Sequence, residues 1–289
     1  MKVLVFGASG MIGHAIYRAL MRTPDIKTWG TVRRLSDKSH FNQQESVQLL
    51  VGSDLERRET VPRFFSAVKP DVVINCVGMT KHHQASSDPQ ISIPINAMFP
   101  HQLSDQCSAI GARLIHISTD CVFSGLKGNY CESDVPDAHD MYGKTKQLGE
   151  IEYPNTLTLR TSTIGHELQS ALGLLEWFLV QQEQCRGFAG ALFSGLTNIE
   201  FSKVVKDIII RNKDLQGLYH VGGPTINKYE LLQIIKRIYK KNVDILRDEE
   251  FVLDRSLDST KFRIASGYQA PDWVDMISTM YKEENNKYV

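Results

Sequence analysis

Tyr142 and Lys146 stand four residues apart in a segment with a helical pattern, so their side chains share one face of the predicted helix. A phenol is a poor acid–base group at its ordinary pKa of about 10. We expect the neighbouring ammonium to favour the phenolate and to lower that pKa toward neutral pH. The ammonium can also hydrogen-bond the ribose of a nicotinamide cofactor. Because this spacing is common on helix surfaces, the pair needs support from other residues.

That support comes from Ser118, Thr119 and Asp120, which follow the apolar run 112–117. The run predicts a buried strand, and its carboxyl end delivers these polar side chains. The Thr119 hydroxyl can hydrogen-bond a carbonyl oxygen and orient it toward Tyr142. These groups would protonate an oxygen while a nicotinamide cofactor delivers hydride to its carbon. Thr119, Tyr142 and Lys146 are therefore the catalytic candidates.

The first twenty residues predict the cofactor site that this chemistry needs. Residues 3–6 form an apolar run typical of a buried parallel strand, and a glycine-rich turn and a helical pattern follow. This arrangement aims backbone N–H groups and a helix N-terminus at one point, which suits a pyrophosphate. Gly7 would make the tight turn, Gly10 would admit the phosphates, and Gly13 would let helix and strand pack closely. A glycine turn without a ligand is the alternative. The cofactor contacts assigned here are Gly7, Ser9, Gly10, Met11, Ile12 and Gly13.

The second predicted strand, residues 26–32, ends in Arg33 and Arg34, and residues 26–34 contain no Asp or Glu. An acidic residue at this point holds the ribose of NAD, whereas an arginine accommodates the 2′-phosphate of NADP. The sequence therefore favours NADP(H), with NAD(H) possible. The alternative is that the two arginines only solvate a loop.

Further cofactor candidates lie at the ends of the next predicted strands. Residues 46–51 predict a third strand, after which Asp54 is either a helix N-cap or an acceptor for the adenine amino group. Residues 71–75 predict a fourth strand, whose end should lie under the cofactor. We expect residues 79–94 to form a loop beside the cleft and residues 95–110 to form a helix. The added cofactor candidates are Asp54, Leu55, Cys76, Val77, Gly78 and Asn96, together with Tyr142 and Lys146.

The alternation of strands and helices predicts an α/β fold: a Rossmann-type doubly wound parallel sheet with a smaller C-terminal α/β substrate-binding domain. Later elements are expected at 155–160, 172–182, 200–211, 218–221 and 229–239. Residues 1–165 would form the NAD(P)-binding domain, with 200–222 returning to it. Residues 166–199 and 223–289 would form the smaller domain.

Composition excludes several function classes. Lys+Arg and Asp+Glu both number 33, so net charge attracts neither nucleic acid nor an anionic membrane. The five scattered cysteines lack C-x-x-C spacing, which indicates reduced thiols and no metal site. We find no apolar run of membrane-spanning length and no signal peptide, and we expect a cytoplasmic protein.

Four segments in combination resemble an extended short-chain dehydrogenase/reductase, and above all the dTDP-4-dehydrorhamnose reductases and their relatives. They are GASGMIG at 7–13, NCVG at 75–78, ISTDCVF at 117–123 and YGKTK at 142–146. The likeness continues at 217–223 and 255–258. It implies a nucleotide-sugar enzyme in which Thr119, Tyr142 and Lys146 form the catalytic triad. The implied reaction reduces the C4 keto group of a nucleotide-linked deoxysugar, in deoxysugar or surface polysaccharide biosynthesis.

The resemblance also implies a set of substrate-binding residues, which are Lys81, Thr119, Asp120, Cys121 and Arg255. Cys121 stands where that family usually has a tyrosine, so we expect a different pocket beside the sugar. Arg255 suits a substrate diphosphate, because a guanidinium matches phosphate geometry. A surface salt bridge is its alternative role.

Two other functions stay open at this point. One is an epimerase or dehydratase that recycles bound NAD(P), for which Asp120 supplies a carboxylate. The other is a non-catalytic NADP-binding subunit, like the regulatory subunit of methionine adenosyltransferase, which the presence of the full triad disfavours. A homodimer formed through helices at 95–110 and 142–153 is possible.

Overall fold

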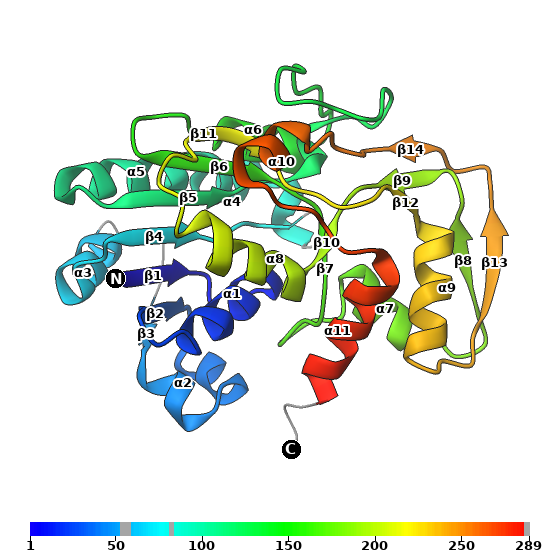
Figure 1. Ribbon diagram of the computed structural model, residues 1–289, viewed down its shortest axis with the longest axis horizontal. Helices are drawn as coiled ribbons and strands as arrows, with labels where there is room; N and C mark the ends of the chain where they lie inside the picture. Colours follow the sequence, from blue (N-terminus) through cyan, green and yellow to red (C-terminus); the bar gives the residue numbers. More distant parts are fainter. Residues whose placement is uncertain (53–58, 81–83, 286–289) are drawn as a thin grey trace.

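The computed structural model describes residues 1–52, 59–80 and 84–285, and its centre is a seven-stranded sheet (Figure 1). All neighbouring strands of this sheet are parallel. The order β11-β6-β5-β4-β1-β2-β3 is that of a doubly wound dinucleotide-binding fold with one added strand. The predicted fold class is therefore confirmed. The strands are β1 (Lys2–Phe6), β2 (Lys27–Val32), β3 (Leu49–Val51), β4 (Val72–Asn75), β5 (Arg113–Ile117), β6 (Thr156–Arg160) and β11 (Gly217–His220).

Alternating side chains of β1 serve two separate hydrophobic cores, because successive residues of a strand point to opposite faces. Val3 and Val5 pack with the layer of α1 (Met11–Met21) and α8 (Asn198–Val204). Leu4 and Phe6 pack with the layer of α3 (Thr60–Val68) and α5 (Phe99–Ile110). Helices thus cover both faces, and the sheet leaves only its edges and strand ends for function.

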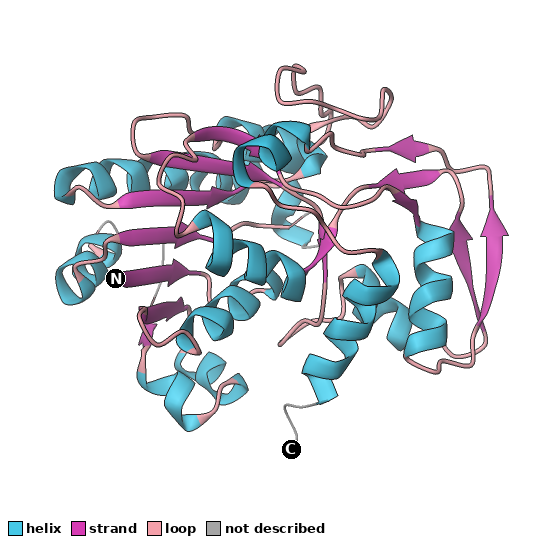
Figure 2. Ribbon diagram, in the orientation of Figure 1, coloured by secondary structure: helices cyan, strands magenta, loops and turns pink. Residues whose placement is uncertain are grey.

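The carboxyl ends of the main strands face a second group of elements (Figure 2). This group contains small sheets of order β12-β9-β14 and β13-β8, with α9 (Lys228–Ile238) against them. The chain leaves the main sheet after β6 and returns to it at β11. The division into two domains at the predicted boundaries stays a prediction. The further strands are β7 (Thr163–Ile164), β8 (Gln184–Phe188), β9 (Ala191–Phe193), β10 (Leu196–Thr197), β12 (Ile226–Asn227), β13 (Asp244–Asp248) and β14 (Leu253–Asp254).

The expected strand at 46–51 is largely wrong. A short helix, α2 (Gln43–Val47), occupies its first part, and β3 keeps only three residues. The cause is a capping box: Asn42 Oδ1 accepts the Glu45 N–H at 2.9 Å, and Glu45 Oε2 accepts the Asn42 N–H at 3.2 Å. These two bonds start a helix where the apolar pattern alone favours a strand.

The expected loop at 79–94 is also wrong in its second half. It contains η2 (Gln84–Ser87) and α4 (Pro89–Ser92), and the π-helical turn η3 (Ile93–Met98) then leads into α5. Asp88 caps α4 by accepting the Gln90 N–H at 2.8 Å, and Pro89 follows at the first helical position.

The remaining helices differ from prediction mainly at their ends. Helix α7 (Leu174–Leu179) is shorter than expected, and α8 begins two residues early because Thr197 caps it. The π turn η5 (Val205–Ile209) continues α8. The other helical elements are η1 (Leu35–His40), η4 (Asp120–Val122), α6 (Met141–Leu148), α10 (Thr260–Ser266) and α11 (Trp273–Asn285). Within the described ranges, no helix combines the length and the apolarity that crossing a membrane requires.

Candidate active site

The glycine-rich turn after β1 is held by backbone contacts that leave no room for a side chain at Gly13. Gly7 has φ of 79°, the left-handed region that favours glycine. A Cβ on Gly13 would lie 2.0 Å from the Gly7 carbonyl oxygen. Gly10 is the N-cap of α1, and no side chain among the described residues caps that helix. The first-turn N–H groups of α1 are therefore available to an anion.

Arg33 and Arg34 lie beside this turn. They follow β2, and β2 is tied to the turn because Thr31 O accepts the Ala8 N–H at 2.9 Å. Asp37 accepts the Arg34 backbone N–H at 3.0 Å and thereby fixes the chain just after β2. Both arginine side chains are exposed.

Asn96 fastens the loop after β4 to helix α6. Its Oδ1 accepts the Met79 N–H at 2.8 Å, and its Nδ2 donates to Met79 O at 3.2 Å and to Thr145 Oγ1 at 3.1 Å. A Cβ on Gly78 would lie 3.9 Å from Lys146 Nζ. The segment 75–78 is thereby placed beside Lys146. Asp54, Leu55 and Lys81 lie outside the described residues.

Helix α6 and the end of β5 bring the three catalytic candidates together. Asp140 starts α6 by accepting the Gly143 N–H at 2.7 Å. A Cβ on Gly143 would lie 2.3 Å from the Cys121 carbonyl oxygen, so only a glycine allows this close approach. Thr119 lies close to Tyr142, and its hydroxyl donates to Asp120 Oδ1 at 3.1 Å. The Lys146 ammonium donates to Ile117 O at 2.7 Å.

The pKa of Tyr142 differs from expectation, whereas Lys146 is an ammonium at neutral pH as expected. Desolvation by the surrounding protein raises the pKa of Tyr142, although the hydrogen bond with Thr119 acts in the opposite direction. Burial lowers the pKa of Lys146 to about 8, while the negative charge of Glu150 opposes that fall. The expected lowering of the Tyr142 pKa is therefore wrong for this arrangement. Tyr142 is a protonated phenol at neutral pH, which suits a group that donates a proton to an oxygen.

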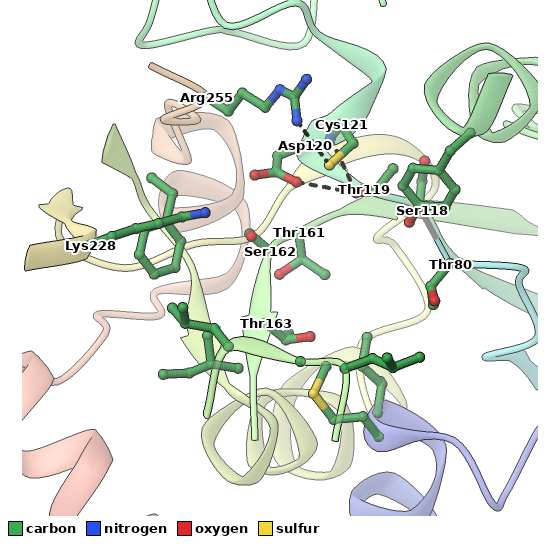
Figure 3. Close-up of a pocket in the computed structure, with 18 of the residues that line it drawn as sticks. Thr80, Ser118, Thr119, Asp120, Cys121, Thr161, Ser162, Thr163, Lys228 and Arg255 are labelled. Carbon is green, nitrogen blue, oxygen red and sulfur yellow. Dashed lines mark hydrogen bonds between the residues drawn. The ribbon is translucent and has the colours of Figure 1, made fainter. Parts of the chain in front are cut away.

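One cavity of about 390 Å³ opens between these elements (Figure 3). Its lining includes the glycine turn, the ends of β5 and β6, the start of α9 and the segment after β14. It brings together most of the predicted catalytic and substrate residues with part of the cofactor loop. The predicted residues in its wall are Gly10, Met11, Ile12, Thr119, Asp120, Cys121, Tyr142 and Arg255.

Arg255 crosses from the C-terminal part of the chain to the end of β5. Its Nε donates to Phe123 O at 2.9 Å, and its Nη1 donates to Cys121 Sγ at 3.4 Å. These partners are a carbonyl and a thiol rather than a carboxylate. These two contacts hold the guanidinium at the cavity wall, and neither of them neutralises its positive charge.

Several residues that line the cavity were not predicted from the sequence. Lys228, at the start of α9, points its ammonium into the cavity (Figure 3). Thr161, Ser162 and Thr163 line the cavity directly after β6. The position of 161–163 after a predicted strand could have indicated them, whereas Lys228 had no local signal. Glu167 orders the next turn by accepting the Leu172 N–H at 2.9 Å. Across the described part of the chain, no three His, Cys, Asp or Glu residues gather as a metal site.

Comparisons with known proteins agree with this geometry. Residues 1–183 match the family described as RmlD substrate binding domain. A mouse protein, methionine adenosyltransferase 2 subunit beta, is 33% identical over 153 residues, which are 52% of this chain but only 41% of the mouse protein. The dTDP-4-dehydrorhamnose reductase of Aggregatibacter actinomycetemcomitans is 24% identical, covering 94% of this chain and 95% of its own. The crystal structure of a dTDP-4-dehydrorhamnose reductase from Bacillus anthracis in complex with NADP superimposes with a TM-score of 0.79 at 20% identity, covering 98% and 99% of the two chains.

Proposed function

This chain belongs to the RmlD substrate binding domain family, and we propose that it is an NADP(H)-dependent reductase of the C4 keto group of a nucleotide-linked deoxysugar. One observation carries the proposal: a single cavity is lined by the glycine turn, by Thr119 and by Tyr142. The full-length likeness to a dTDP-4-dehydrorhamnose reductase supports the same reaction class. In this proposal the protein acts in the cytoplasm, in deoxysugar or surface polysaccharide biosynthesis.

The residues around the glycine turn fit NADP(H). The uncapped N-terminus of α1 would hold the pyrophosphate, and the exposed Arg33 and Arg34 would hold the 2′-phosphate. Lys146 and the segment after β4 would contact the nicotinamide half. When bound, NADPH supplies the hydride that reduces the keto carbon. NAD(H) is the weaker cofactor in this proposal.

Tyr142 and Thr119 act on the keto oxygen. Thr119 and Tyr142 lie close together in the lining of one cavity, so one keto oxygen can contact both hydroxyl groups. Because Tyr142 is protonated at neutral pH, it can give its proton to that oxygen as the carbon is reduced. The Lys146 ammonium then stabilises the phenolate that Tyr142 becomes.

The far wall of the cavity suits the nucleotide end of the substrate. Lys228 and Arg255 supply two cations there, which match a diphosphate. The hydroxyl groups of residues 161–163 can hydrogen-bond a sugar. The substrate contacts proposed from the sequence remain Lys81, Thr119, Asp120, Cys121 and Arg255. A homodimer is proposed on the sequence pattern alone.

The test is oxidation of NADPH, with NADH in parallel, by the purified protein and a panel of nucleotide-linked 4-ketosugars. Oxidation should require a ketosugar, and Tyr142→Phe should lower kcat by about 100-fold or more because the proton donor is lost. Wild-type turnover by Tyr142→Phe would refute the mechanism. Inversion at C4 without net oxidation of cofactor would instead support an epimerase.

The likeness to methionine adenosyltransferase 2 subunit beta favours a second candidate, a protein that binds NADP without turning it over. The match covers 41% of that relative, and the paired Thr119 and Tyr142 argue for catalysis. Tight NADPH binding with no oxidation for any ketosugar would support this second candidate.

A further inference from the structure

Glu150 is a nearly buried carboxylate that none of the sequence motifs includes. It lies one helical turn beyond Lys146, directly after α6, and its side chain is 10% exposed. Its Oε1 accepts the Ser118 hydroxyl at 2.7 Å and Arg160 Nε at 2.8 Å. Its Oε2 accepts Arg160 Nη2 at 2.7 Å. Both oxygens of this carboxylate are therefore hydrogen-bonded, which fixes its position next to the strand end that carries Thr119.

The groups around Lys146 single out Glu150 as a source of negative charge. Desolvation raises the pKa of Cys76, after β4, to about 12, so its thiol is neutral at pH 7. Burial holds the pKa of His116, on β5, well below its ordinary value, so its imidazole is neutral as well. Tyr142, on the same helix, is a neutral phenol. Of these four neighbours, only Glu150 bears a charge that favours the ammonium.

We propose that Glu150 is a positioning residue for the reduction: its carboxylate keeps Lys146 charged and, through Ser118, fixes the strand end that presents Thr119. The inference rests on the proposed function, since it assigns Glu150 a part in that reaction. Two contacts support the positioning role. Ser118 is bound to Glu150, and the preceding residue, Ile117, accepts the Lys146 ammonium at 2.7 Å.

Arg160 allows the Glu150 carboxylate to remain charged although both side chains are nearly buried. Its bidentate pair with Glu150 compensates the buried negative charge, which would otherwise be costly. Arg160 Nη1 also lies 3.2 Å from His220 Nε2, and His220 Nδ1 donates to Tyr130 O at 3.0 Å. Since the pKa of His220 is lowered to about 4 by burial, its ring is neutral and adds no opposing charge.

The experiment is the pH profile of kcat/KM for NADPH-dependent reduction by wild type and Glu150→Gln. Loss of the carboxylate leaves Arg160 as an unbalanced cation, so Lys146 should lose its proton at lower pH. The alkaline limb of the profile is expected to move down by about 1 pH unit or more, since a neighbouring charge commonly shifts a pKa by about 1–3. Glu150→Asp keeps the charge and should keep the limb near its wild-type position.

A second pair of variants separates charge from structure. Ser118→Ala removes a hydrogen bond and no charge, so it should lower kcat without moving the limb. Arg160→Gln leaves Glu150 unbalanced and should move the limb upward. If Glu150→Gln does not fold, the upward shift expected for Arg160→Gln is the test. An alkaline limb of Arg160→Gln that stays at the wild-type pH or moves to lower pH would then overturn the inference.

Direct titration of Lys146 distinguishes failure of the inference from failure of the proposed function. NMR of lysine-labelled protein, with Lys146→Arg to assign the signal, reports the ammonium pKa without any turnover. A wild-type Lys146 titration and an unmoved limb in folded Glu150→Gln would refute the role of Glu150. A shifted titration in a protein that reduces no ketosugar would refute the proposed reaction, and with it the catalytic part of the inference.

Discussion

Alanine at Gly13 should lower the stability of the fold, whereas alanine at Gly10 should lower the affinity for NADPH, because the surroundings of the two glycines differ. A Cβ on Gly13 would lie 2.0 Å from Gly7 O and 2.8 Å from Gly7 C. Both are backbone atoms, so the turn must move by about 1 Å or more to restore ordinary contacts. A Cβ on Gly10 would meet only Gly7 O, at 3.4 Å. The φ of −77° at Gly10 is one that any residue adopts.

These contacts set the expected magnitudes. Gly13→Ala should destabilise the fold by about 1–3 kcal/mol, the usual cost of overpacking, and lower Tm by several degrees. Gly10→Ala should change the free energy of unfolding by no more than about 0.5 kcal/mol. Its methyl group, however, stands where the backbone approaches the proposed pyrophosphate. NADPH affinity should therefore fall about 10- to 100-fold, which is about 1.4–2.8 kcal/mol of binding free energy.

Thermal unfolding of the cofactor-free protein and calorimetric titration with NADPH measure the two effects separately. Gly10→Ala serves as the folded control for Gly13→Ala, since both add one methyl group to the same turn. Wild-type NADPH affinity in Gly10→Ala would show that the pyrophosphate lies elsewhere. A wild-type Tm in Gly13→Ala would refute the packing argument.

Two further predictions concern charge. Replacing Arg33 and Arg34 together by alanine should raise the KM for NADPH about 10- to 100-fold and leave the KM for NADH nearly unchanged, because only NADPH carries the 2′-phosphate; equal losses for both cofactors would contradict this role. Stability should fall as pH drops from about 6.5 to 4, because buried His220 and His116 both have lowered pKa values in the fold and take up protons more readily when unfolded. The pKa of about 4 for His220 makes its share on the order of 3 kcal/mol. Urea unfolding across this pH range measures that slope, and a folded His220→Gln variant that keeps the full slope would assign it to other groups.

Local patterns sufficed for most strands of the sheet, β3 excepted, and for the residues at the ends of β1, β4 and β5. The glycine turn, the Thr119 strand end and the Tyr142–Lys146 pair each lie within one short strand–turn–helix segment, where spacing fixes geometry. Parallel strands place their carboxyl ends along one edge, so these separate segments could be predicted to meet. The cavity lining bears out that meeting for Thr119, Tyr142 and the glycine turn.

Features that depend on burial or on distant packing could not be predicted in this way. The raised pKa of Tyr142 reflects desolvation by several elements at once, which a four-residue spacing does not report. Lys228 reaches the cavity because α9 packs against the small sheets beyond the main one, and no local pattern reports that packing. Helix α2 is a different case, because the residues of its capping box, Asn42 and Glu45, can be read in the sequence. The prediction of a strand gave more weight to the apolar pattern that follows them.

The wall of the cavity that carries Lys228 and Arg255 comes from stretches far along the chain from Thr119 and Tyr142. Arg255 contacts Cys121 and Phe123 beside Thr119, whereas Lys228 starts a separate helix, so substitutions at position 228 should disturb the residues that handle the proton least. Related proteins with this architecture can therefore change which sugar they bind through single substitutions, while the residues that transfer the proton stay the same. The same separation makes residues 228 and 253–255 a natural place to begin a combinatorial library for altered substrate choice.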